Sequence, residues 1–212
     1  FPTRRSSDLD DLRAEFDAVV LAGGATHARD LPIPGRELAG IHQAMEYLPL
    51  ANRVQEGDLL SSPIDVAGKN VVIIGGGDTG ADCLGTAHRQ GAKAIHQFEI
   101  MPRPPDHRAE STPWPTWPLM FRTASAHEEG GERLFSVNTE CFLDDGNGRV
   151  KALRAHEVEM VDGRFTKVEG TDFELEADFV FLSMGFTGPE SAWITVQFPV
   201  ELDPRSNVAR DL

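Results

Sequence analysis

Short apolar runs bounded by glycine are the strongest pattern in this chain. Residues 70–74 (NVVII) are apolar on both faces, as is a strand inside a parallel sheet. Residues 94–99 and 178–185 (DFVFLSMG) continue this pattern, and residues 17–22 (DAVVLA) run into two glycines. The pattern predicts a buried strand at each of these four places.

Helical spacing of apolar positions occurs twice. Residues 78–90 place Ala81, Leu84 and Ala87 on one face and end at a glycine, which predicts a helix directly after the strand at 70–74. Residues 41–54 show the same spacing until Pro49 interrupts it. Together with the following run, the first of these helices predicts a strand–helix–strand unit of about 30 residues.

The second half of the chain has a different pattern of apolar and turn-forming residues. Residues 102–118 hold six prolines and two tryptophans, which indicates an irregular loop. Residues 135–178 alternate strand-like runs with turn signals at 145–148 and 162–163, which predicts a β-meander. We interpret the polar run at 127–129 (HEE) as a solvated face. The fold class predicted from the residues is α/β, a Rossmann-like domain with an inserted β-meander.

One spacing is repeated at a distance. Asp-x-Val-x-Leu-x-x-Gly occurs at residues 17–24 and again at 178–185. Buried strands that end at glycine often have this appearance. A second interpretation is that both are crossings between two nucleotide-binding domains.

The net charge of the chain argues against some classes of binding partner. Lys and Arg number 20 against 34 Asp and Glu, a net charge of −14. So acidic a chain repels phosphate backbones and anionic lipid surfaces, and we expect neither nucleic-acid nor membrane binding. A local anion site built from backbone N–H groups remains compatible with this charge.

Cysteine usage points to a reducing compartment. Cys83 and Cys141 are isolated in sequence. Two cysteines can neither ligate an iron–sulfur cluster nor build a disulfide framework, so we expect a cytoplasmic location.

The segment GGGDTG carries the clearest chemistry. It contains G-x-G-x-x-G after the strongest strand and opens a helix, the context that a dinucleotide site requires. The candidate cofactor-binding residues here are Gly75, Gly76, Gly77, Asp78, Thr79 and Gly80. We interpret Asp78 as the helix N-cap; a plain glycine-rich turn is the alternative.

Residues after the second strand give conflicting signals about the cofactor. Glu99 lies 19 positions after Gly80, where an acidic residue would accept from the ribose 2′-hydroxyl and favour NADH. Arg103 and Arg108 follow in the loop, where either would pair with the 2′-phosphate of NADPH. NADH and NADPH both remain open.

Other catalytic machinery is missing from the sequence. The seven histidines show no metal-ligand spacing, and no G-x-S-x-G segment occurs. A dinucleotide loop without acid–base machinery fits hydride transfer, in which the cofactor does the chemistry. We expect no catalytic side chain and no metal site.

At this point a family resemblance can be stated. The segments FDAVVLAGGA, VVIIGGGDTGADCLGTAHRQGAK, FEIMPRPPDHRAESTPWPTWP, HEEGGER and ADFVFLSMGFTGPE resemble the small (beta) subunit of bacterial glutamate synthase. The resemblance implies a flavoprotein reductase in which an NAD(P)H domain is inserted into an FAD domain. It further implies electron transfer from NAD(P)H through FAD and iron–sulfur clusters to a large subunit, which makes glutamate from glutamine and 2-oxoglutarate.

The resemblance also implies site residues and boundaries. It places Ser183, Met184 and Gly185 at a crossover beside the nucleotide, and Gly23 and Gly24 near the flavin. We expect a leader foreign to the fold or disordered at 1–11, FAD-domain segments at 12–62 and 184–212, and the NAD(P)H domain at 63–183. The FAD loop and the cluster cysteines are expected only in a longer protein.

Two other functions remain possible at this stage. One is the NAD(P)H-binding module of a related FAD and iron–sulfur oxidoreductase. The other is a non-catalytic nucleotide-binding domain.

Overall fold

The computed structural model describes residues 8–20, 22, 24–189, 195–196, 200–204 and 207–209. These fall into two compact units. The central unit is Asp30–Gly185, and the terminal unit combines residues 1–29 with 186–212. Each unit is described by itself.

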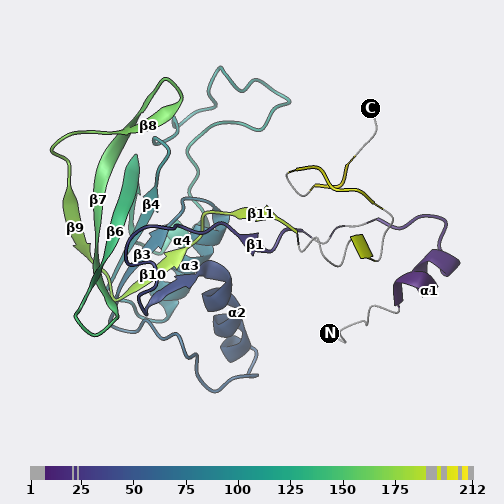
Figure 1. Cartoon of the computed structure of the whole chain (residues 1–212), viewed down its shortest axis with the longest axis horizontal. Helices are drawn as coiled ribbons and strands as arrows, with labels where there is room; N and C mark the ends of the chain where they lie inside the picture. Colours follow the sequence, from purple (N-terminus) through teal and green to yellow (C-terminus); the bar gives the residue numbers. More distant parts are fainter. Residues whose placement is uncertain are drawn as a thin grey trace. The chain divides into compact units, whose positions relative to one another are not determined.

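A five-stranded parallel sheet forms the middle of the central unit (Figure 1). Its strands, in spatial order, are β2 (Ile41–Gln43), β10 (Phe179–Leu182), β3 (Asn70–Ile74), β4 (Ala94–Glu99) and β5 (Glu132–Phe135). Because every neighbouring pair is parallel, the carboxyl ends of all five strands meet at one edge.

Helices cover one face of this sheet. They are α2 (Ala44–Gln55), α3 (Asp78–Arg89) and the short α4 (Ser125–Glu128). On β3, Val71 and Ile73 pack with Tyr47 of α2 and Leu84 of α3 in a fully buried cluster. The strand–helix–strand prediction for residues 70–99 is confirmed.

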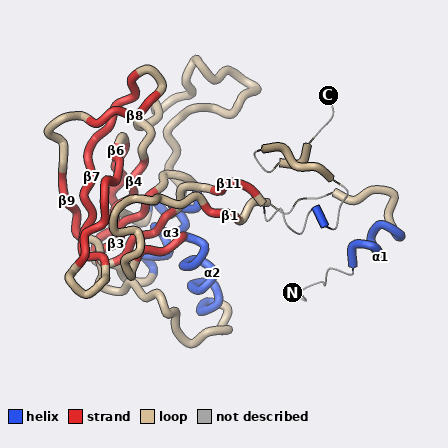
Figure 2. The backbone as a smooth tube through the Cα atoms, viewed as in Figure 1, coloured by secondary structure: helices blue, strands red, loops and turns tan. Residues whose placement is uncertain are grey.

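An antiparallel meander covers the opposite face, as Figure 2 shows. It consists of β6 (Val137–Asp144), β7 (Val150–Val161), β8 (Arg164–Lys167) and β9 (Phe173–Glu176), with β7 paired to each of the others. Val72 and Ile74, the alternate residues of β3, pack here with Phe142 and Leu153. The predicted meander is therefore present. The strand predicted at 178–185 is also present, as β10.

The predicted boundary at residues 62 and 63 differs from the observed division. Residues 41–43, expected to start a helix, form β2, which pairs in parallel with β10. This pairing places residues 30–62 in the central unit, so that unit begins at Asp30. The helix extends through Pro49 to Gln55, and β5 was not predicted at all.

The terminal unit contains α1 (Asp8–Glu15) and a small antiparallel pair, β1 (His27–Ala28) with β11 (Phe186–Gly188). Residues 8–11, expected to belong to a disordered leader, lie in α1, whose Arg13 stands in the last turn where a cation suits the helix dipole. Residues 1–7 lie outside the described residues.

The strand predicted at 17–22 is not formed. Residues 17–20 and 22 have no strand structure, and the Val20 side chain is 88% exposed. A buried strand needs neighbouring strands, and the described part of this unit offers only the short β1–β11 pair. No described helix is long and apolar enough to cross a membrane.

Candidate functional site

A cavity of about 800 Å³ opens at the carboxyl edge of the parallel sheet, beside β3 and β4. In open α/β sheets this edge is where ligands bind. Five segments line the cavity: the glycine loop, the end of β4, the proline-rich loop with residues 119–124 that follow it, α4 and β5. The lining residues with polar or charged chemistry include Asp78, Glu99, Arg103, Arg122, His127 and Arg133.

At three positions of the loop, glycine has a different structural role. Gly75 has φ +125°, a conformation that side chains disfavour. A Cβ on the buried Gly80 would overlap the Gly75 carbonyl and lie 2.5 Å from Nε2 of Gln97. A Cβ on Gly77 would meet nothing within 4 Å, and Gly77 lines the cavity. Gly77 thus leaves space for a ligand rather than for the protein.

The amino terminus of α3 faces this space. Its N-cap is Gly77, which has no side chain to bond the first-turn N–H groups. Those groups lack intrahelical partners and carry the positive end of the helix dipole, which together make an anion site. The interpretation of Asp78 as the N-cap is wrong: it is the first helical residue, exposed at the cavity.

Glu99, at the end of β4, braces the loop from the cavity side. Its Oε2 accepts a hydrogen bond from the Gly76 N–H at 2.9 Å, and its Oε1 accepts from the Met101 N–H at 2.9 Å. The carboxylate also lines the cavity. Each oxygen has further acceptor capacity. Glu99 can therefore hold the loop and still accept from a ligand hydroxyl.

Three arginines gather on aromatic rings at the same cavity. The guanidinium carbons of Arg103 and Arg133 lie 4.1 and 4.7 Å from the ring centroid of Phe121, and that of Arg122 lies 4.2 Å from that of Trp117. Burial, with repulsion from Arg103, lowers the pKa of Arg133, while Glu99 opposes this shift. Arg103 is also paired with Asp106, with 2.6 Å between Nη2 and Oδ1.

A buried polar chain links the glycine loop to α4. The Ala124 N–H donates to Nδ1 of His127 at 3.1 Å, so the proton is on Nε2, which donates to Oε1 of Gln97 at 2.9 Å. Nε2 of Gln97, a residue 1% exposed, donates to the Gly75 carbonyl at 2.9 Å. His127 lines the cavity and is half-buried, so the interpretation of residues 127–129 as a solvated face is wrong for this residue.

With this geometry in place, comparison with known proteins is informative. A family model described as pyridine nucleotide-disulphide oxidoreductase matches residues 3–113, just over half of the chain. The chain belongs to the pyridine nucleotide-disulphide oxidoreductase family.

The chain is similar to several curated glutamate synthases. The chain is 71% identical to the glutamate synthase [NADPH] small chain of Mycobacterium tuberculosis over 94% of its own length and 42% of that protein's. It is 40% identical to the Bacillus subtilis small chain, over 85% of this chain and 39% of that protein. It is 41% identical to the glutamate synthase [NADH] of Schizosaccharomyces pombe, over 95% of this chain and 10% of that protein. The chain spans less than half the length of each of them.

Solved structures confirm the fold of this oxidoreductase. Mycobacterium tuberculosis FprA in complex with NADPH matches with a TM-score of 0.59 at 17% identity, over 93% of this chain and 55% of that one. An FAD-dependent pyridine nucleotide-disulphide oxidoreductase from Desulfovibrio vulgaris matches with a TM-score of 0.53 at 21% identity, over 90% and 40%.

Several residues singled out in the sequence of this family member do not reach the cavity lining. Arg108 instead donates to the carbonyls of Thr112 and Thr116, at 2.8 and 3.0 Å, and so holds the proline-rich loop together. Arg122 and Arg133 take the place expected for it. The sequence signal for Arg133 is weak, because the pairing of β5 with β4 brings it to the cavity, and Arg122 lies in the loop before α4.

The crossover residues lie beneath the loop. Ser183 Oγ donates to the carbonyls of Ile74 and Gly75, at 3.1 and 3.3 Å, and so fastens β10 to the end of β3. Met184 packs on the core between sheet and meander, and Gly185, at φ +80°, ends the central unit. Ser183 therefore supports the loop, and none of the three residues lines the described cavity.

Two predicted flavin neighbours belong to the terminal unit. Gly23 lies outside the described residues. Gly24 is exposed with φ +68°, and a Cβ there would meet nothing within 4 Å. Their role near a flavin stays a prediction.

Proposed function

We propose that this chain is the NAD(P)H-binding part of a glutamate synthase small subunit. The observation that carries the proposal is the open space beside Gly77, at the uncapped amino terminus of α3 and within the large cavity. A pyrophosphate needs this combination of close backbone approach and unpaired N–H donors. The 71% identity to a glutamate synthase small chain supports the wider assignment.

The residues present fit a dinucleotide along the length of the cavity. The pyrophosphate would lie over Gly77 and the first turn of α3, and the adenosine ribose would face Glu99. Trp117 and Phe121 offer flat apolar surfaces next to guanidinium groups, which suit an adenine ring.

We further propose that NADPH is preferred over NADH. Three arginines, Arg103, Arg122 and Arg133, line the cavity with two carboxylates, Asp78 and Glu99, while Arg103 is also paired with Asp106. A 2′-phosphate between Arg103 and Arg133 would relieve the repulsion that lowers the pKa of Arg133. The relatives from Mycobacterium tuberculosis and Bacillus subtilis are named as NADPH enzymes, which supports this proposal, whereas that from Schizosaccharomyces pombe is named as an NADH enzyme.

The chain's own residues bind and orient the cofactor. Bound NAD(P)H would supply a hydride for the reduction of FAD, and the whole protein would use these electrons, through iron–sulfur clusters and a large subunit, to make glutamate from glutamine and 2-oxoglutarate. Here Gln97 and His127 hold the loop carbonyl in place, and Ser183 ties the loop to β10. The flavin, the clusters and the large subunit are part of the proposal for the whole protein.

Titration with NADPH and NADH, followed by cofactor fluorescence, tests the proposal. Gly77→Ala and Gly77→Val should weaken binding progressively, because each added carbon enters the space left for the pyrophosphate. Circular dichroism melts of both variants should show only the small loss, about 1 kcal/mol, expected when Ala or Val replaces Gly at a helix N-cap, since a Cβ at Gly77 contacts no other residue. Equal affinity in all three proteins would contradict the assignment of the site.

A further inference from the structure

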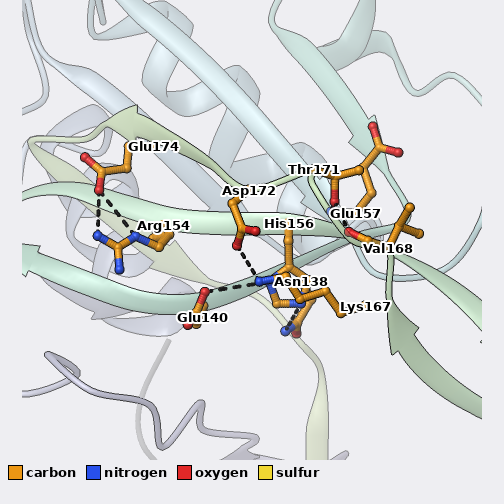
Figure 3. Close-up of polar contacts among 10 residues, drawn as sticks. All are labelled: Asn138, Glu140, Arg154, His156, Glu157, Lys167, Val168, Thr171, Asp172 and Glu174. Atoms are coloured by element: carbon orange, nitrogen blue, oxygen red, sulfur yellow. Dashed lines mark hydrogen bonds and ion pairs between the residues drawn. The ribbon is translucent and has the colours of Figure 1, made fainter.

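A second cluster of chemically active groups lies on the outer face of the meander, remote in sequence from the glycine loop. It consists of Glu140 on β6, His156 on β7 and Asp172, just before β9 (Figure 3). One nitrogen of His156 and one oxygen from each carboxylate all lie within 4.8 Å of one another. Three strands of one sheet thus bring three donor groups together.

A β-bulge directs Glu140 toward this face. Thr139 is paired with Ala155 and Cys141 with Arg154, so Glu140 is an extra residue in β6. Ala155 lies in the core, and strand alternation therefore turns His156 outward, to the side where Glu140 is exposed. Bulges commonly re-aim a side chain at a functional position.

The environment of His156 indicates, independently of the two carboxylates, that a ligand binds here. Its side chain is only 9% exposed, and its buried Nδ1 has no hydrogen-bond partner among the described residues. Nδ1 points to Oε2 of Glu140, which at 3.9 Å is beyond hydrogen-bonding distance. A buried nitrogen without a hydrogen-bond partner calls for an explanation, and a cation held between it and the two carboxylates would supply one.

Asn138 can set the imidazole for metal binding. Its amide nitrogen Nδ2 lies 3.3 Å from Nε2 of His156, directly across the strand pair, and a half-turn of the amide would exchange this nitrogen for Oδ1. With the amide turned so that its oxygen faces the ring, Nε2 carries the proton and the Nδ1 lone pair points to the carboxylates. Histidine ligands are typically oriented by a partner of this kind.

Charge at the cluster favours a divalent cation. Lys167 Nζ contacts Oδ1 of Asp172 at 2.5 Å, which leaves the second oxygen of Asp172 for a ligand. Glu140 and Glu169 also act on Lys167, so the carboxylates exceed the ammonium in number. One imidazole with two carboxylates suits zinc better than calcium or magnesium, which take oxygen ligands.

We propose that Glu140, His156 and Asp172 bind one zinc ion, with water completing a four-coordinate shell. Zinc ligands lie about 2.0 to 2.2 Å from the metal, so the two exposed carboxylates must close in slightly on Nδ1. The bound ion would fasten β6 and β9 to the central strand β7. It is separate from the proposed nucleotide site and does not depend on it.

Calorimetric titration of the full chain with zinc chloride, after removal of metals with EDTA, tests the proposal. We expect one strong site in the unmodified chain and an affinity at least about tenfold weaker in His156→Gln, which keeps an amide near Asn138 but removes Nδ1. Glu140→Gln and Asp172→Asn change exposed side chains and should weaken zinc binding similarly without affecting the fold. Lys167→Met should strengthen binding, because it frees both oxygens of Asp172.

Matched controls exclude other zinc ligands. Glu174→Gln alters a neighbouring exposed carboxylate that pairs with Arg154, and His42→Gln alters a histidine paired with Glu46. Both should leave zinc affinity unchanged. The proposal is overturned if zinc binding survives in His156→Gln, if it is lost in Cys141→Ser or His42→Gln but not in Glu140→Gln, or if calcium binds more tightly than zinc.

Discussion

Gln97 and His127, thirty residues apart, are joined by a hydrogen bond of 2.9 Å at the floor of the cavity. The same glutamine holds the Gly75 carbonyl, so the position of the glycine loop depends on a residue of α4. Gln97→Met would keep the length of the side chain but leave the carbonyl and the imidazole N–H without their partner. We expect a loss of about 1 to 3 kcal/mol in the free energy of unfolding and weaker NADPH binding.

Gln90→Met is the matched control for this prediction. Gln90 accepts a hydrogen bond from Tyr47 at 3.0 Å, outside the cavity lining. Urea denaturation should show a lower free energy of unfolding for both variants, whereas the affinity for NADPH should fall only in Gln97→Met. Unchanged NADPH affinity in Gln97→Met would show that the polar chain does not support the site.

Gly80 and Gly77 should respond differently to the same substitution. Gly80→Ala places a methyl group against the Gly75 carbonyl and Nε2 of Gln97, so we expect a destabilisation of about 1 to 3 kcal/mol as well as loss of NADPH binding. Gly77→Ala should weaken binding but reduce stability by no more than about 1 kcal/mol, the cost of alanine at a helix N-cap. Thermal melts and NADPH titrations of the pair separate the two roles, and a Gly77→Ala variant destabilised as much as Gly80→Ala would contradict this distinction.

Cofactor preference should depend on the arginines at the cavity. We expect Arg103→Gln or Arg133→Gln to weaken NADPH binding by about tenfold, since a charge-assisted hydrogen bond is lost, with little effect on NADH. Arg108→Gln should leave the ratio of the two affinities unchanged, because Arg108 bonds only to loop carbonyls. If Glu99→Gln raises NADPH affinity more than these substitutions lower it, Glu99 controls the preference instead.

His127 should make stability depend on pH. Burial, together with Arg133, holds its pKa below the ordinary 6.5, while Asp78 opposes the shift. As pH falls below about 6.5, the unfolded chain therefore takes up a proton before the folded chain does, and stability is lost. The advantage of the unmodified chain over His127→Gln, measured by urea denaturation, should be smaller at pH 5.5 than at pH 7.5. An advantage that grows on acidification would contradict a lowered pKa.

The strand–helix–strand unit, the glycine loop and the meander can be predicted from the sequence pattern alone. Local signals are sufficient there, because Val71 to Ile74 are apolar on both faces and the glycines follow at once. It also gave Glu99 its place at the end of β4.

Which charged residues lie together at the cavity depends on tertiary contacts that the sequence pattern does not reveal. Arg133 enters it because β5 pairs with β4, and Arg108 is withheld because it bonds carbonyls of its own loop. The strand predicted at residues 17–22 also depends on tertiary pairing. Its apolar pattern matches that of β10, but Val20 is exposed, whereas Val180 is buried between β2 and β3. An apolar run specifies a strand only where neighbouring strands satisfy its backbone hydrogen bonds.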